Sequence, residues 1–419
     1  MSDYKVSRRD FLKLSMAGMT LGAVPLLNAC APGVAVAPSS QTATLRMWGN
    51  HPEWKDPLLA NLAVFEEKAG VDIELEPKPG PEYVQLLNAA FQAAEGPDLP
   101  GIVPGPLLDE FLENGYIMDL AEEVEVDSLI ANARERVTRE DGKIAGVPFA
   151  RFTVGLFYHT DIFEELGLSA PRTWDELRSV SDELLAAGRT PLLMPAKDGV
   201  IPSFYYLLAS GSVIGPDGFK ELLTGERKLT DPDIVASLEY LVSLKDYFPE
   251  GFASIGYADG KASFARGDIA IALGGSADYS GYVEVNEDVQ LDFVAFPAPS
   301  ASDGFPVTLT GLELVYGVNP ESAHTDKGIE FMRWLTTPEA SQLFANNVAL
   351  PVVEGVIPER PIWARQVEES EYDMPFMREI VATAPVWNVL TSSMQSVLLG
   401  EMSLEEISEE AQAALIIEG

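Results

Sequence analysis

The fold is indicated most clearly by residues 43–77, ATLRMWGNHPEWKDPLLANLAVFEEKAGVDIELEP. This stretch has in turn the patterns of a strand, a helix and a second strand. ATLRMWG predicts a short strand. KDPLLANLAVFEEKAG predicts a helix that ends near Gly70, because glycine readily takes the left-handed conformation that closes a helix. In VDIELEP the apolar residues occupy every second position, as in a strand with one buried face. This order is typical of a mostly parallel sheet flanked by helices.

The alternation of strands and helices continues along the chain. Residues 83–94, YVQLLNAAFQAA, predict a helix, and residues 96–103, GPDLPGIV, return to the sheet. Three later helices carry start signals: capping boxes at Thr173 with Glu176 and at Ser403 with Glu406, and Thr337 at an N-cap before Pro338. Residues 268–282, DIAIALGGSADYSGY, predict an apolar strand that runs into a glycine-rich turn.

The composition favours a globular protein with a strongly acidic surface. The chain has 419 residues, of which 47% are hydrophobic, and a formal net charge of −37. The length is suited to two domains or one large one. The charge repels nucleic acid, whose phosphates require lysine and arginine, and it also repels anionic lipid headgroups. Because the acids are dispersed and do not form a tail, they indicate a solvated surface.

The N-terminal segment has the layout of an export signal. Residues 7–13, SRRDFLK, precede a run of apolar and small residues that is shorter than the roughly 20 residues of a spanning helix. The adjacent Arg8 and Arg9 indicate the twin-arginine form of this signal. The only cysteine, Cys30, ends the sequence LNAC, which resembles a bacterial lipobox, and residues 31–44 are rich in small residues and proline. We therefore expect residues 1–29 to be a signal peptide, Cys30 to be lipidated, and residues 30–43 to be a tether.

The sequence lacks the constellations that mark an enzyme or a metalloprotein. His51, His159 and His324 are isolated from one another, and a single cysteine cannot complete the common zinc spacings. There is no Walker P-loop and no G-x-S-x-G elbow. We therefore expect no catalytic residue, no bound metal and no cofactor.

Four stretches together resemble one protein family. They are residues 141–177, DGKIAGVPFARFTVGLFYHTDIFEELGLSAPRTWDEL; residues 264–282, FARGDIAIALGGSADYSGY; residues 328–353, GIEFMRWLTTPEASQLFANNVALPVV; and residues 384–415, APVWNVLTSSMQSVLLGEMSLEEISEEAQAAL. In this order they resemble the extracellular solute-binding proteins of ABC importers, in the sugar-binding group that includes maltose-binding protein. The resemblance spans nearly all of the chain after Cys30.

The resemblance implies an α/β fold with two lobes, each a mostly parallel sheet flanked by helices, joined by a hinge. Residues 44–152 with 296–350 would form lobe 1, and residues 153–295 with 351–419 would form lobe 2. The chain would cross between the lobes near residues 150–154, 294–297 and 350–352. Ligand would bind in the cleft between the lobes, which close on it.

The resemblance also implies candidate ligand contacts, because sugars are held by aromatic rings and by planar polar groups. Trp387 matches an aromatic residue that stacks on sugar, Arg151 lies at the first crossing, and Glu313 lies near the start of a strand that faces the cleft. The remaining candidates are His51, Glu53 and Trp54 after the first strand, Phe204 and Tyr205 in IPSFYYLL, and Gly275, Ser276 and Tyr279 in the glycine-rich loop. For several of these, above all the tyrosine and phenylalanine pair, burial in the core is the competing interpretation.

Two departures from the family pattern bear on the ligand. Ala277 occupies the position where the family often has tryptophan, and residues 96–111 carry no aromatic side chain before Phe111. Asp98 in this region is expected to be structural. The ligand is therefore expected to be smaller than a long maltodextrin, or differently shaped.

The sequence therefore predicts a monomeric lipoprotein that delivers an extracellular carbohydrate to the permease subunits of an ABC transporter. The protein would be periplasmic or anchored to the outer face of the cell membrane. The membrane contact would be made through the lipid alone, and no nucleic acid would bind. Three alternatives stay open at this level: a binder of a glycerol-phosphate or polyamine-like solute, a secreted glycoside hydrolase, and a surface adhesin.

Overall fold

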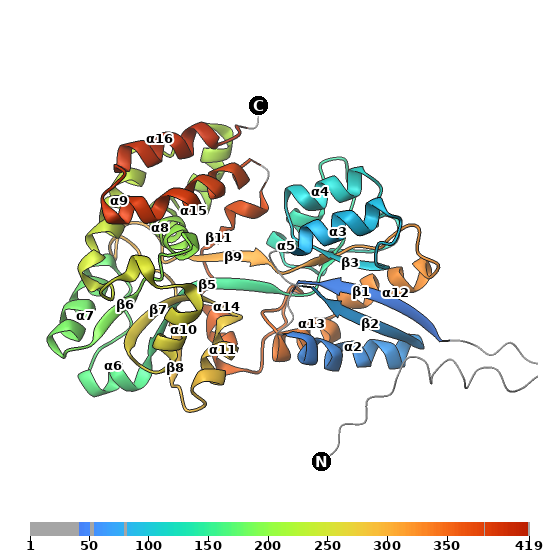
Figure 1. Cartoon of the computed structure of the whole chain (residues 1–419), viewed down its shortest axis with the longest axis horizontal. Helices are drawn as coiled ribbons and strands as arrows, with labels where there is room; N and C mark the ends of the chain where they lie inside the picture. The colour runs from blue at the N-terminus through green and yellow to red at the C-terminus, as the bar shows by residue number, and fades with distance from the viewer. Residues whose placement is uncertain (1–41, 51–53, 79–81, 381, 418–419) are drawn as a thin grey trace, which may run out of the picture. The chain divides into compact units, whose positions relative to one another are not determined.

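The computed structural model describes residues 42–50, 54–78, 82–380 and 382–417, and these residues form two lobes, each built on one sheet (Figure 1). The first lobe has the strand order β2-β1-β3-β10-β4. Its strands are β1 (Ala43–Gly49), β2 (Val71–Pro77), β3 (Leu99–Ile102), β4 (Val147–Pro148) and β10 (Val315–Tyr316), and its helices are α2 (Lys55–Ala69), α3 (Tyr83–Gln92), α4 (Pro106–Glu113), α5 (Ala131–Val137), α12 (Thr325–Leu335) and α13 (Pro338–Asn347).

The second lobe has the strand order β11-β9-β5-β7-β6, with β8 also paired to β5. Its strands are β5 (Arg151–His159), β6 (Thr190–Leu193), β7 (Ile269–Gly275), β8 (Leu291–Val294), β9 (Thr308–Leu312) and β11 (Asp373–Pro375). Its helices are α6 (Thr160–Leu166), α7 (Trp174–Ala186), α8 (Val200–Thr224), α9 (Pro232–Ser243), α10 (Tyr257–Ala265), α11 (Asp278–Val285), α14 (Pro361–Glu368), α15 (Ala384–Leu399) and α16 (Leu404–Ala414), with short 3-10 helices η3 (Lys245–Tyr247), η4 (Phe252–Ser254) and η5 (Met377–Glu379).

The local signals of the sequence are confirmed in the structure. The strand, helix and strand of residues 43–77 are β1, α2 and β2, and α2 ends at Gly70, whose φ is 63°. The capping boxes at Thr173 and Ser403 are formed, and the Thr337 side chain accepts a hydrogen bond from the backbone N–H of Ala340 at 3.2 Å. Asp98 is structural, as expected, because its carboxylate accepts hydrogen bonds from Arg46 N and Ser322 Oγ. The expected turn after β7 is formed by Ser276 and Ala277, and α11 begins directly after it at Asp278.

Both sheets are mostly parallel, as expected, and each contains one strand that runs against the others: β10 in the first lobe and β5 in the second. β1 pairs in parallel with β2 and β3, but β10 is antiparallel to β3 and β4, and β5 is antiparallel to β7, β8 and β9. The cause is the path of the chain between the lobes. It leaves the first lobe from β4 into β5 and returns from β9 into β10, so the outgoing and returning strands lie side by side and run in opposite directions.

The residues buried in the core of each lobe place the lobe boundaries later in the sequence than expected. Phe296, Val307 and Leu309 are buried in the core of the second lobe, whereas Leu312 is buried in the core of the first, so the return crossing lies between Leu309 and Leu312 and not at 294–297. Val352 and Val356 are buried in the core of the first lobe, beyond the expected end at 350. The return is delayed because β9 stays paired with β5 up to Leu312.

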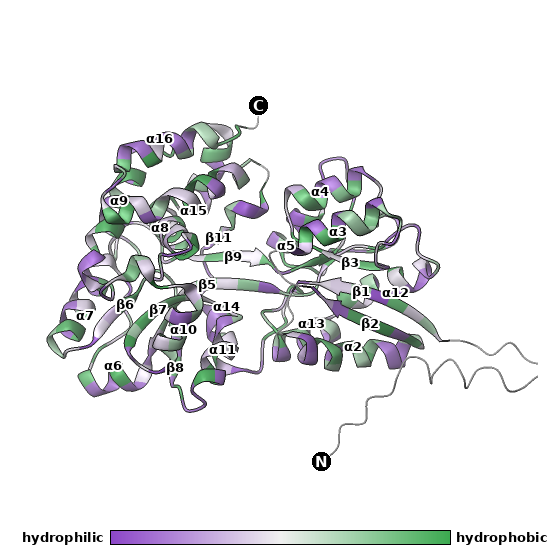
Figure 2. Ribbon diagram, viewed as in Figure 1, coloured by the Kyte–Doolittle hydropathy of each residue, from purple (hydrophilic) through white to green (hydrophobic). Residues whose placement is uncertain are grey.

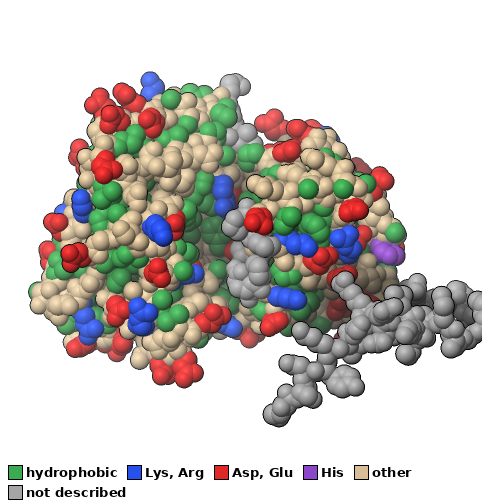
Figure 3. All heavy atoms as spheres, in the orientation of Figure 1, with side chains coloured by type: hydrophobic (Ala, Val, Ile, Leu, Met, Phe, Trp, Pro, Cys, Tyr) green, Lys and Arg blue, Asp and Glu red, His purple; other side chains and the backbone are tan. Residues whose placement is uncertain are grey.

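Apolar side chains cover the strands and the inner sides of the helices. Figure 2 shows green strands in the interior and helices such as α7 and α16 that carry both green and purple residues. In α7 the buried residues Leu177, Val180 and Leu184 recur at helical spacing, as the sequence predicted. Acidic side chains are scattered over the face drawn in Figure 3 and do not form one patch, as expected for a solvated acidic surface.

Candidate ligand-binding site

A small cavity of about 170 Å³ lies at the base of the second lobe's crossing strands. It is lined by Phe152 and Val154 of β5, Ile201 and Phe204 of α8, Tyr257 of α10, Leu273, Gly274 and Gly275 of β7, Ala277 and Asp278 at the start of α11, and Glu313 after β9. The walls therefore come from segments far apart in sequence, which meet where the chain passes between the lobes.

One wall of the cavity is aromatic and is held by further aromatic rings behind it. Phe152 packs edge-on against Phe376 at 5.7 Å between ring centroids, and Phe204 lies 5.2 Å from the same ring. Phe204 also lies 5.3 Å from Trp387. Each ring is fixed by its neighbours, so the wall presents rigid apolar faces to a ligand.

The polar rim of the cavity is organised around Asp278. Its carboxylate accepts hydrogen bonds from the Tyr257 hydroxyl at 2.5 Å, from Lys261 Nζ at 3.1 Å and from the backbone N–H of Gly275 at 2.7 Å. Burial raises the pKa of Tyr257 well above its ordinary value, and the neighbouring Asp278 charge raises it further. The Tyr257 hydroxyl therefore stays protonated and keeps donating to Asp278 at all physiological pH values.

Three of the predicted site residues, Phe204, Gly275 and Glu313, border this cavity. Glu313 is mostly buried, and its backbone N–H donates to Ala150 O at 3.0 Å, which fixes it to the outgoing chain. Sequence reasoning missed Phe152 although it singled out the adjacent Arg151. Successive side chains of a strand point to opposite faces, and this alternation was the available signal.

Two other predicted residues are buried beside the cavity and do not line it. Tyr205 is fully buried, and its hydroxyl donates to Leu193 O at 3.2 Å, so it belongs to the core of the second lobe. Ser276 is also fully buried, and its hydroxyl oxygen accepts from the backbone N–H of Thr153 at 2.9 Å. The hydrogen bonds of both side chains are used within the protein.

Arg151 ties the crossing segments together in this structure. Its backbone pairs with Leu350 and Leu312, its Nε donates to Pro351 O at 3.2 Å, and its Nη1 lies 3.1 Å from Asp373 Oδ2. The guanidinium is therefore engaged with the protein, and a ligand contact by Arg151 stays a prediction.

The predicted aromatic contacts are packed against the protein. Trp387 is only 7% exposed and lies edge-on to Phe376 at 4.8 Å. Trp54 is buried in the first lobe, edge-on to Phe149. Tyr279 is partly buried and packs on a small core cluster around Trp363. His51, Glu53 and Cys30 lie outside the described residues.

Metal-binding clusters and membrane spans are absent from the part of the chain that the structure describes. Among those residues, no group of three His, Cys, Asp or Glu side chains is placed to hold a metal ion. None of the helices described there has the length and apolar character needed to cross a bilayer.

Comparison with known proteins shows which family this chain resembles. Residues 48–342 match the family described as bacterial extracellular solute-binding protein. The multiple sugar-binding protein of Streptococcus mutans is 22% identical over 358 residues, which cover 83% of this chain and 84% of that protein. The galactooligosaccharide-binding protein of Bacillus subtilis is 29% identical over 161 residues, or 38% of this chain and 37% of that protein.

Solved structures share the fold over almost their whole length. The apo form of RafE from Streptococcus pneumoniae has a TM-score of 0.75 at 21% identity, and the match covers 90% of this chain and 98% of that one. A protein studied for xylan utilization in Caldanaerobius polysaccharolyticus also has a TM-score of 0.75, at 20% identity, with 88% and 99% covered. The chain belongs to the bacterial extracellular solute-binding proteins and has their two-lobed α/β fold.

Proposed function

We propose that this protein captures a small carbohydrate in the cavity bordered by Phe152 and Phe204 and delivers it to the permease subunits of an ABC transporter. The names of its relatives support the ligand class: they include a multiple sugar-binding protein and a galactooligosaccharide-binding protein. RafE, which shares the fold, has been solved in complex with raffinose. The protein acts by binding and release and carries out no chemistry on the sugar.

The observation that carries this proposal is the pairing of aromatic faces with carboxylates around one cavity. Phe152 and Phe204 offer apolar faces to sugar C–H groups, while Glu313 and Asp278 offer carboxylate oxygens on the polar side. The volume of about 170 Å³ is below the roughly 300–1,000 Å³ of typical small-molecule sites. This volume favours a monosaccharide, or one ring of a short oligosaccharide.

The same cavity gives a specific reason for a second candidate. The aromatic rings of the cavity also suit an organic cation, because a cation is attracted to the faces of aromatic rings. The polyamine-like solute is therefore the second candidate. A glycerol-phosphate is disfavoured, since Lys261 is already paired with Asp278 at 3.1 Å.

We further propose that the protein is exported as a folded chain and held at the outer face of the membrane by lipid on Cys30. The support comes from the twin arginines at Arg8 and Arg9 and from the lipobox-like LNAC. The membership of the family of extracellular solute-binding proteins agrees with an exported location. The lobes would then close on the sugar by bending at the three crossings between them.

A thermal-shift screen of the purified protein tests the ligand class. A panel of mono- and disaccharides, raffinose, putrescine and glycerol-3-phosphate is used. A specific ligand stabilises by ~2.7 kcal/mol at a hundredfold excess over its Kd. Small-angle scattering with the stabilising compound should show a smaller radius of gyration. Stabilisation by putrescine alone would favour a polyamine-like solute as the ligand. Turnover of a chromogenic glycoside would show that the protein is a glycoside hydrolase and would overturn the proposed binding function.

A further inference from the structure

A lysine is bound to the carboxylate that organises the polar rim of the cavity. Lys261 of α10 donates from Nζ to Asp278 Oδ1 at 3.1 Å, and Asp278 lines the cavity. The side chain of Asp278 is 9% exposed and that of Lys261 is 29% exposed, so the pair is mostly shielded from water. A Cβ at Gly281 of α11 would be 3.9 Å from Lys261 Nζ. The ammonium is therefore held between α10 and α11, in contact with a carboxylate of the cavity.

The same ammonium also lies over an aromatic ring of the cavity. Tyr257 and Lys261 are four residues apart on α10, which places both side chains on one face of the helix. Lys261 Nζ is 4.6 Å from the centroid of the Tyr257 ring, and Tyr257 lines the cavity. The Tyr257 hydroxyl donates to Asp278 Oδ2 at 2.5 Å. A carboxylate beside an aromatic face is a combination that binds an ammonium ligand, and here Lys261 already uses both groups.

The carboxylate of Asp278 keeps only a small capacity for a ligand. A carboxylate offers about four acceptor positions. The Tyr257 hydroxyl, the Lys261 ammonium and the backbone N–H of Gly275 each donate to it, the last at 2.7 Å. The capacity that remains suits a neutral hydroxyl donor. An ammonium ligand in the same place would lie beside the ammonium of Lys261, and the two like charges would repel each other.

We propose that Lys261 makes the cavity selective for neutral ligands, because its ammonium occupies the place that an organic cation would take. The inference rests on the proposed sugar-binding function and deepens it by naming the charge of the ligand. A neutral sugar can donate a hydroxyl to Asp278 without displacing Lys261, whereas a polyamine-like solute has to displace the lysine or bind against its charge. Lys261 acts through Asp278 and Tyr257 and is therefore a positioning residue that sets selectivity.

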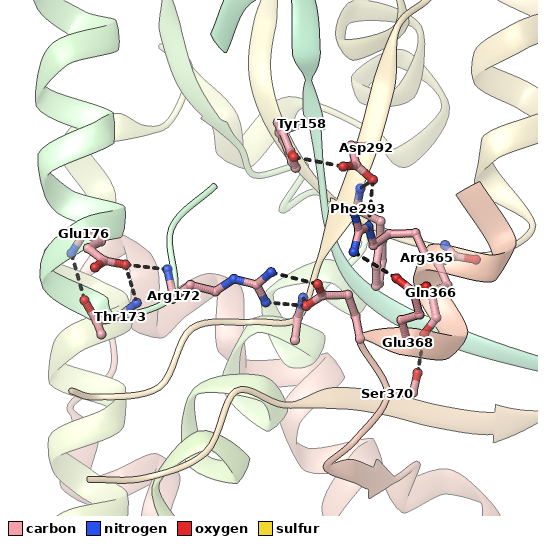
Figure 4. Close-up of polar contacts among 12 residues, drawn as sticks. Tyr158, Arg172, Thr173, Glu176, Asp292, Phe293, Arg365, Gln366, Glu368 and Ser370 are labelled. Carbon is pink, nitrogen blue, oxygen red and sulfur yellow. Dashed lines mark hydrogen bonds and ion pairs between the residues drawn. The ribbon is translucent and has the colours of Figure 1, made fainter. Parts of the chain in front are cut away.

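A second group of tyrosine, aspartate and cation in the same lobe provides a matched control. The Tyr158 hydroxyl of β5 donates to Asp292 Oδ2 of β8 at 3.1 Å, and Arg365 Nε of α14 lies 3.5 Å from Asp292 Oδ1 (Figure 4). Arg365 Nη1 also pairs with Glu368 Oε2 at 2.9 Å. The described residues that line the cavity include none of these four. Removing the charge of Arg365 therefore alters the net charge as much as removing that of Lys261, but at another place.

The test compares putrescine binding by the parent, Lys261→Met and Arg365→Met in the absence of any sugar. Methionine keeps an unbranched side chain and removes the charge in both variants. In calorimetric titrations Lys261→Met should bind putrescine at least about tenfold more tightly than the parent, because Asp278 and the Tyr257 ring become available to the ligand. Arg365→Met should bind putrescine as weakly as the parent. A lysine with a purely structural role would lower Tm when replaced and would create no affinity for putrescine.

A second variant keeps the test informative if Lys261→Met folds poorly. Lys261→Ala removes from the side chain the same heavy atoms that propylammonium contains. Propylammonium should therefore raise the Tm of Lys261→Ala, because it restores the contacts with Asp278 and Tyr257. Propan-1-ol, which has nearly the same shape and no charge, should not raise it. Combining Lys261→Ala with Asp278→Asn should abolish the effect of propylammonium.

The outcomes separate the role of Lys261 from the binding of sugar. The role of Lys261 is overturned if the parent already binds putrescine, if Lys261→Met gains no affinity beyond that of Arg365→Met, or if propylammonium does not stabilise Lys261→Ala. Failure of the proposed sugar binding gives a different result. In that case no carbohydrate stabilises the parent, while the gain of putrescine binding in Lys261→Met persists.

Discussion

Replacing Trp387 by alanine should primarily destabilise the protein. The family resemblance suggested a ring that stacks on sugar, but the ring is 7% exposed and packs against Phe204 and Phe376 at 5.3 and 4.8 Å. Truncating a buried tryptophan removes its burial energy and leaves a cavity, at a cost of ~3–5 kcal/mol. Because Phe204 borders the ligand cavity, affinity for the sugar should also fall, as a secondary consequence of the lost support.

The expected change in melting temperature follows from the size of the folded unit. Thr42–Gly419 contains about 380 residues, and an unfolding entropy of about 2.1 cal/mol/K per residue gives about 0.8 kcal/mol/K. A loss of ~3–5 kcal/mol then lowers Tm by about 4–6 °C. Calorimetric melts of Trp387→Ala and Trp387→Phe measure this, and the phenylalanine variant should lose less because it keeps a ring.

A second tryptophan provides the control. Trp174 is partly exposed and stacks on Tyr240 at 4.0 Å, away from the cavity, so Trp174→Ala should cost less stability and leave sugar affinity unchanged. The reasoning is refuted if Trp387→Ala melts like the parent and loses binding of the sugar identified by the screen. That result would mean that the ring faces the ligand in solution, as the resemblance implied.

Three other predictions follow from the cavity, from Glu379 and from the N-terminal segment. A Cβ at Gly275 would meet its nearest atoms at 3.7 Å, so Gly275→Ala should keep both the fold and sugar binding. Gly275→Leu should instead fill the cavity and abolish binding, with little change in Tm. Equal sugar affinities of the two variants would exclude this cavity as the binding site. Burial raises the pKa of Glu379 to about 7 from an ordinary 4.5, so its contribution to the free energy of unfolding is present below about pH 4.5 and is lost as the pH rises through 7. Denaturant titrations between pH 5 and 8 should therefore show that the free energy of unfolding of the parent falls relative to that of Glu379→Gln. A difference between the two proteins that does not change with pH would contradict this. Cys30→Ala should release the protein from membranes and a double lysine replacement of Arg8 and Arg9 should block export, whereas fractionation that still finds the Cys30→Ala protein on membranes would disprove the lipid anchor.

Much of the fold was predictable because its signals are local. The strands and helix of residues 43–77, the capping boxes at Thr173 and Ser403 and the N-cap at Thr337 depend on neighbours within about four positions in the chain. The family could be predicted for a related reason, since its recurring stretches keep their order along the chain. The candidate site was predicted less well. Phe204, Gly275 and Glu313 border the cavity, whereas Tyr205 and Ser276 are wholly buried beside it.

The sequence by itself determined the alternating α/β architecture, the acidic surface, the absence of common catalytic motifs and the export-like N-terminus. These properties depend on composition and on patterns among neighbouring residues, so the sequence alone contains the information that they require. The tertiary structure alone decided which strands pair, the return crossing between Leu309 and Leu312, the meeting of Phe152 with Glu313 and the contact of Arg136 with Glu379. Arg136 and Glu379 are separated by 243 positions in the chain, and only the packing of the two lobes brings them together. Whether a side chain lies in the core or lines a cavity likewise depends on the residues that the fold places opposite it.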